Sequence, residues 1–133
     1  MFVFSGDIGR ERDLLLYPPK RPQHADYLFL ESTYGDRLHT DESLSNKLTA
    51  LIEDSISKKG SLIIPSFAVE RLQTLMFILW KLHKEKRIPH IHIYIDSPMG
   101  SNVLQVFQQF PEWHKLSHEE FQAMKNRMHI VSS

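Results

Sequence analysis

The stretch from residue 60 to residue 95, GSLIIPSFAVERLQTLMFILWKLHKEKRIPHIHIYI, decides the fold class. It contains two short apolar runs, 61–65 and 91–95, each of the length expected for a buried strand. Between them, apolar residues recur at helical spacing from Val69 to Leu82. A strand, a helix and a second strand in this order predict a parallel α/β unit.

The same alternation continues on both sides of this stretch. Further strands are predicted at residues 2–4, 27–30 and 128–131, and further helices at residues 44–56, 103–110 and 117–125. The whole chain is therefore predicted to have an α/β fold with a parallel sheet.

The composition excludes several classes of protein. Of 133 residues, 41% are hydrophobic and 24% are charged, which is typical of a globular domain and not of a disordered tail, a collagen or a coiled coil. Basic and acidic residues number 16 each, so the net charge predicts no general affinity for nucleic acid or acidic membranes. The absence of cysteine excludes disulfides, thiol nucleophiles and cysteine-ligated zinc. No leader or membrane-spanning segment is visible, which predicts a soluble cytoplasmic protein.

Polar side chains cluster directly after the predicted strands, where open α/β sheets bind their ligands. Asp7 lies between glycines in such a loop, where a carboxylate either holds a divalent metal or caps its own turn, and the turn is the commoner case. Glu31 follows the second strand, where it either orients a histidine that binds a metal or caps the next segment.

Three further features are candidates for a functional role. Ser66 and Arg71 either bind an anion at a helix N-terminus or belong to an ordinary helix start. Asp96 and Ser97 end the strand at 91–95. His90 and His92 have the spacing of a metal-binding pair, but no Asp-His follows them, so they are interpreted as a pair on one strand face whose role stays open.

Four segments resemble, in order and spacing, the β-CASP group of metallo-β-lactamase-fold nucleases. They are FSGDIGR at 4–10, LESTYGDRLH at 30–39, IPSFAVERLQ at 64–73 and YIDSPM at 94–99. The relatives they resemble most are the bacterial RNA-processing exonuclease-like proteins and the endonuclease subunit of the mRNA 3′-end cleavage factor. One departure is Glu70, at a position where the family usually has glycine.

The resemblance implies an architecture. Residues 1–39 correspond to the C-terminal part of a metallo-β-lactamase domain with motif A, and residues 40–133 to part of a parallel-sheet β-CASP domain. Both ends of the chain are expected to be cuts through a larger fold.

The resemblance also implies an activity, which is zinc-dependent hydrolysis of RNA, by an exonuclease or an endonuclease. Asp7 would bridge a pair of zinc ions and Glu31 would support an active-site histidine. Cleft candidates for single-stranded RNA are Ser66, Arg71, Asp96 and Ser97. The other zinc ligands of the family match no residue here, so this chain alone is expected to bind little zinc and to be inactive. The resemblance allows a homodimer of the complete protein.

Two alternatives remain open. The chain is either a non-catalytic nucleic-acid-binding or interaction module of α/β fold, or a small-molecule domain in which Asp7 and Asp96 are structural turn residues.

Overall fold

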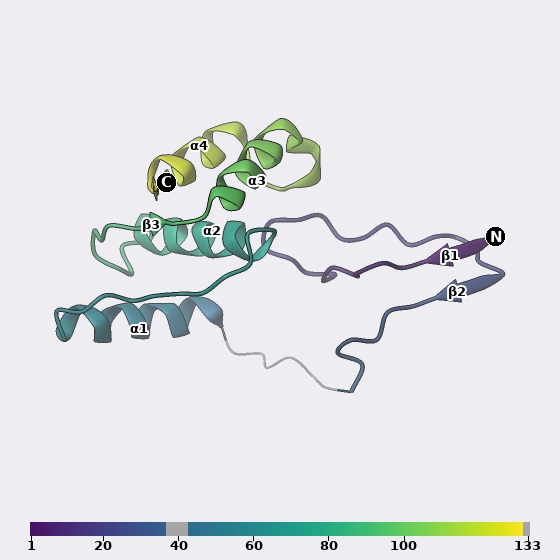
Figure 1. The fold of residues 1–133 in the computed structure, drawn as a ribbon, viewed down its shortest axis with the longest axis horizontal. Helices are drawn as coiled ribbons and strands as arrows, with labels where there is room; N and C mark the ends of the chain where they lie inside the picture. Colours follow the sequence, from purple (N-terminus) through teal and green to yellow (C-terminus); the bar gives the residue numbers. More distant parts are fainter. Residues whose placement is uncertain (37–42, 132–133) are drawn as a thin grey trace.

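The computed structural model describes residues 1–36 and 43–131, which form an arm and a helical body. The arm, residues 1–36, extends away from the helices in Figure 1. It carries strands β1 (Phe2–Phe4) and β2 (Tyr27–Phe29). The body contains α1 (Leu44–Ser57), α2 (Arg71–Lys84), β3 (Tyr94–Ile95), α3 (Pro98–Gln109), the 3-10 helix η1 (Pro111–Trp113), α4 (His118–Asn126) and β4 (His129–Ile130). The predicted domain boundary at residues 39 and 40 lies outside the described residues.

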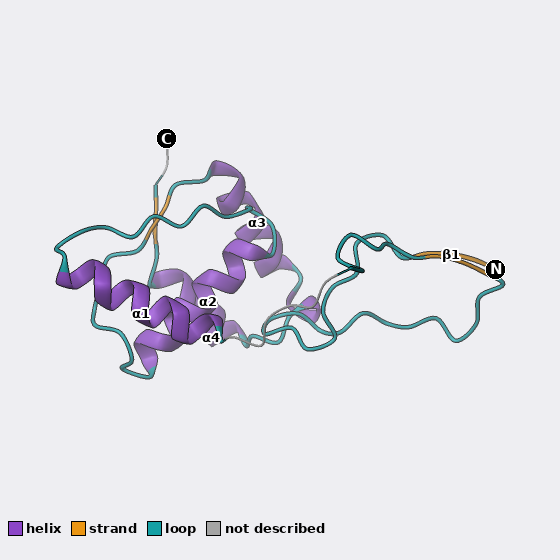
Figure 2. Ribbon diagram, turned by 90° about the horizontal axis from the view of Figure 1, so that it is seen from below, coloured by secondary structure: helices purple, strands orange, loops and turns teal. Residues whose placement is uncertain are grey.

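The strands form two separate parallel pairs. In the arm, Phe2 pairs with Tyr27 and Phe4 with Phe29, and the paired rings stack at 4.8 and 4.6 Å between centroids. In the body, Tyr94 of β3 pairs with His129 of β4. Figure 2 shows the two pairs at opposite ends of the molecule. The α/β class and the parallel pairing are therefore confirmed, while the four strands of the described residues do not join into one sheet.

The predicted strand at residues 61–65 is wrong, because these residues form no strand in the structure. Pro65 has no N–H to donate to a ladder, and Lys59 and Gly60 turn the chain directly before the segment, so few residues remain for pairing. Leu62 and Ile64 instead face residues 91–95 across a cleft of about 550 Å³. The two segments thus line the same cleft and are not paired by a ladder of hydrogen bonds.

Side-chain caps fix where α1, α3 and α4 begin. The hydroxyl of Ser97 accepts a hydrogen bond from the Gly100 N–H at 3.0 Å, so α3 starts at Pro98 rather than at residue 103 as predicted. Ser117 and Glu120 form a reciprocal capping box, which places α4 where the sequence predicts a helix. None of the helices in the described part of the chain combines the length and the apolar character needed to cross a membrane.

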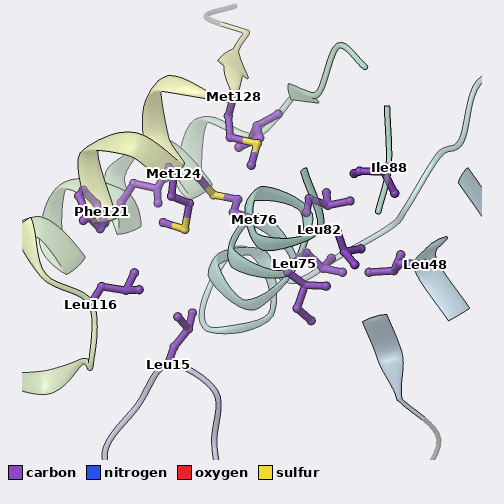
Figure 3. Packing of buried hydrophobic residues seen from close by; sticks show 14 of the residues in the cluster. Leu15, Leu48, Leu75, Met76, Leu82, Ile88, Leu116, Phe121, Met124 and Met128 are labelled. Atoms are coloured by element: carbon purple, nitrogen blue, oxygen red, sulfur yellow. The ribbon is translucent and has the colours of Figure 1, made fainter. Parts of the chain in front are cut away.

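Helix α2 is the centre of the hydrophobic core. Its residues Leu75, Met76 and Leu82 pack between α1 and α4 in Figure 3. Leu15, which lies in a stretch with no predicted element, belongs to the same core and is only 1% exposed. The loop between β1 and β2 therefore returns to the helical body and anchors the arm there.

The start of α2 contains a strained turn at Glu70. Its φ and ψ angles are 62° and −54°, and the Arg71 N–H donates to the Val69 carbonyl oxygen at 2.7 Å. This is the geometry of the rare γ-turn, which is costly for a residue with a Cβ. Glycine suits this position because it adopts this backbone angle without steric cost.

We expect Glu70→Gly to raise the free energy of unfolding by about 1 kcal/mol, because glycine adopts a positive φ without steric cost. Urea unfolding of both proteins measures the difference. Glu53→Gly is the matched control, since Glu53 is exposed in the interior of α1. The control should lower stability by about 1 kcal/mol, and a loss of stability in both variants would contradict strain at Glu70.

Candidate functional site

The loops that follow β1 and β2 are joined by hydrogen bonds through Ser5. The Ser5 N–H donates to the carbonyl oxygen of Phe29 at 2.9 Å, and the Ser5 hydroxyl accepts from the Glu31 N–H at 2.9 Å. The same hydroxyl donates to the Gly6 carbonyl oxygen at 2.7 Å. Ser5 thus holds the candidate residues Asp7 and Glu31 on loops at the same edge of the strand pair.

The carboxylate of Glu31 is fixed by backbone donors. It accepts the N–H of Thr33 at 2.9 Å. This bond, the Thr33 side chain and the backbone of Ile8 hold the pKa of Glu31 below its usual value, against a smaller opposing effect of burial. Glu31 is therefore a carboxylate at neutral pH and touches the loop that carries Asp7.

Asp7 is exposed at the tip of the loop after β1. The chain turns at Gly6, whose φ of 55° lies in the left-handed region that favours glycine. Among the residues that the structure describes, the Asp7 carboxylate accepts no hydrogen bond and forms no ion pair. It does not cap its own turn, which leaves its oxygens available to a ligand.

The described residues do not by themselves make a zinc site. Within 1–36 and 43–131, no three His, Asp or Glu side chains gather as a metal-binding group. Zinc requires three or four protein ligands, and among the described residues of the joined loops Asp7 offers an uncommitted carboxylate.

The other candidates belong to the helical body. Ser66 donates its hydroxyl to the carbonyl oxygen of Phe67 at 3.1 Å, and Arg71 is the exposed first residue of α2. Ser97 caps α3, and Asp96 is exposed directly before it. In the described part of the chain, no hydrogen bond or ion pair connects these four residues to Asp7 or Glu31.

Two features were missed in the sequence analysis. Ser5 is the residue that couples the loops, and its only signal is a small polar residue at a strand end. The second feature is a line of rings on the outer face of β3 and β4, where His90 and His92 lie 5.9 Å apart between centroids. The prediction that these two histidines share a face is consistent with this contact.

The chain is similar to one known domain family and to several known proteins. Residues 72–133 match the Beta-Casp domain family. The chain is 36% identical over 122 residues to Ribonuclease TTHA0252 of Thermus thermophilus, which covers 91% of the chain and 27% of that protein. It is 35% identical over 117 residues to Endoribonuclease YSH1 of Kluyveromyces lactis. This alignment covers 81% of the chain and 15% of that protein. It is 33% identical over 113 residues to the cleavage and polyadenylation specificity factor subunit 3-I of Arabidopsis thaliana. This alignment covers 81% of the chain and 16% of that protein. The chain spans less than a third of the length of each of these relatives.

Proposed function

Because the chain belongs to the β-CASP family, we propose that the complete protein hydrolyses phosphodiester bonds of RNA. The similarity to Ribonuclease TTHA0252 carries the proposal, since it extends over 91% of the chain. The proposed role of this activity is processing or decay of RNA in the cytoplasm. A homodimer of the complete protein stays a prediction from the resemblance.

Within this proposal, the residues of the arm have distinct roles. Asp7 offers a carboxylate that no neighbour in the described chain occupies, which suits a metal ligand. Glu31 is held ionised by Thr33 and is tied through Ser5 to the same edge, which suits a residue that positions a histidine. A zinc pair would need its remaining ligands from outside the described residues.

Metal content and RNA cleavage, measured side by side, test the proposal. The 133-residue chain is compared with a version that carries the flanking coding sequence on both sides. We expect the extended protein to bind zinc and to cleave single-stranded RNA, and the 133-residue chain to do neither. The length of the products distinguishes an exonuclease from an endonuclease.

Two results would contradict the proposal in different ways. Cleavage by the 133-residue chain with tightly bound zinc would show that its own residues complete the metal site. Absence of both zinc and cleavage in the extended protein would favour the non-catalytic binding module.

A further inference from the structure

Five rings form a continuous column on one face of the helical body. The contacts run from His83 to His90 (5.5 Å between centroids), to His92 (5.9 Å) and to His129 (5.6 Å). Tyr94 stacks on His129 at 5.1 Å and on His92 at 6.3 Å, both with 29° between ring planes. We call these five residues the ring column.

The column is exposed because of the strand register. His92 and Tyr94 are two residues apart and share a face, and the pairing of β3 with β4 places His129 beside Tyr94. Tyr94 is 66% exposed, and His90, His92 and His129 are also exposed. The alternate residues Ile91, Ile93 and Ile95 belong to the hydrophobic core or pack against it, so the rings are not needed to fill the core, although His92 and Tyr94 also line the cleft next to it.

Basic side chains adjoin one end of the column. A hollow of about 630 Å³ is lined by residues that include His83, Lys84, Lys86, Arg87 and His90. Glu85, the one acidic residue within residues 81–92, is shared between Lys81 at 3.9 Å and Arg87 at 3.8 Å. In the part of the chain that the structure describes, Lys86 forms no ion pair.

The charge around His83 is net positive. Burial lowers the pKa of His83, and electrostatic interactions with Arg127 and His90 lower it further. The Arg127 guanidinium donates to the Ile91 carbonyl oxygen. A site with this excess of cations attracts anions even though the chain has no net charge.

We propose that the ring column and Lys84, Lys86 and Arg87 form a binding surface for single-stranded RNA, separate from the loops that carry Asp7 and Glu31. Exposed rings next to cations are the combination that binds single strands, since bases stack on the rings and phosphates meet the cations. An acidic protein would use the cations but would not need the rings. The choice of RNA as the ligand rests on the proposed function.

The surface adjoins two of the cleft candidates and extends beyond them. Asp96 directly follows β3, and Ser66 lines the same cleft as His92 and Tyr94. Arg71 begins α2 and Lys84 ends it, and 14 residues of α-helix span about 20 Å. RNA on this surface would therefore reach from these candidates to the cations near Lys84, which increases affinity for longer strands.

Fluorescence anisotropy with the full-length protein in EDTA tests the surface without cleavage. The probe is a labelled oligouridylate of about 12 nucleotides. We expect Tyr94→Ala and, independently, His92→Ala to weaken binding by about tenfold, and Tyr94→Phe to leave it within about twofold, because phenylalanine keeps the stacking ring. An abasic oligomer of the same length should bind more weakly and be insensitive to Tyr94→Ala.

Salt dependence tests the cations. Lys86→Gln should reduce the slope of log affinity against log salt by about 0.7, and Lys20→Gln, an exposed lysine of the arm, should not change it. Unchanged binding in both ring variants would overturn the proposal, and so would equal losses in Tyr94→Ala and Tyr94→Phe. If the full-length protein binds RNA with these dependences but never cleaves it, the proposed function fails and this surface stands. If the full-length protein cleaves RNA while the ring variants bind RNA like the wild type, the proposed function stands and this surface fails.

Discussion

Replacing Asp7 with alanine should reduce RNA cleavage by the full-length protein by about a thousandfold or more. A carboxylate that binds a catalytic metal contributes several kcal/mol of transition-state stabilisation, and each 1.36 kcal/mol is a factor of about ten in rate. The measurement is kcat/KM on a single-stranded RNA substrate, together with the zinc content of the purified variant. We expect both to fall.

The structure makes this variant easy to interpret. Asp7 is exposed, and its carboxylate has no hydrogen bond or ion pair to any described residue, so its loss removes no contact that stabilises the fold. Asp54→Ala is the matched control, because Asp54 is an exposed aspartate of α1 paired only with Lys58 at the surface. The control should retain activity. Cleavage at the wild-type rate in Asp7→Ala would exclude a metal-binding role for this residue.

The parts of the fold that local patterns determine were predictable from the sequence. Helical spacing and a cap fix α1 and α4, and short apolar runs fix β1 and β2. The segment 61–65 has a strand-like composition, yet whether it pairs depends on a partner edge that sequence periodicity does not describe. Glu70 is similar, since its positive φ becomes visible only in the folded chain.

The candidate site also has parts that were predictable from the sequence and parts that depend on how the strands pair. A position after a strand was sufficient to select Asp7 and Glu31, because strand ends collect polar residues in α/β folds. The coupling between them through Ser5 depends on the register of β1 and β2, which no local pattern specifies. The ring column has the same origin, because the contact of His129 with Tyr94 joins residues far apart in the chain.

The anchor of the arm on the helical body gives the second large effect. Leu15 packs against Leu116 and Phe121 in the core, and its carbonyl oxygen accepts the Lys115 N–H at 2.7 Å. Asp13 shapes this segment, since its carboxylate accepts the N–H groups of both Leu15 and Leu16 at 2.7 Å. The loop between the two strands of the candidate site is therefore held by one buried side chain and its adjoining hydrogen bonds.

We expect Leu15→Ala to lower the free energy of unfolding by about 2–5 kcal/mol, because it removes a buried side chain and leaves a cavity between the arm and α4. Leu14→Ala is the matched control, since Leu14 is the same residue type at the next position but is 52% exposed, and it should change stability by less than about 0.5 kcal/mol. Urea unfolding measures both variants. Amide exchange at Lys115 reports locally, because its N–H loses protection only if the Leu15 segment detaches from the body. Equal effects of the two variants, or unchanged exchange at Lys115 in Leu15→Ala, would show that this side chain does not anchor the arm.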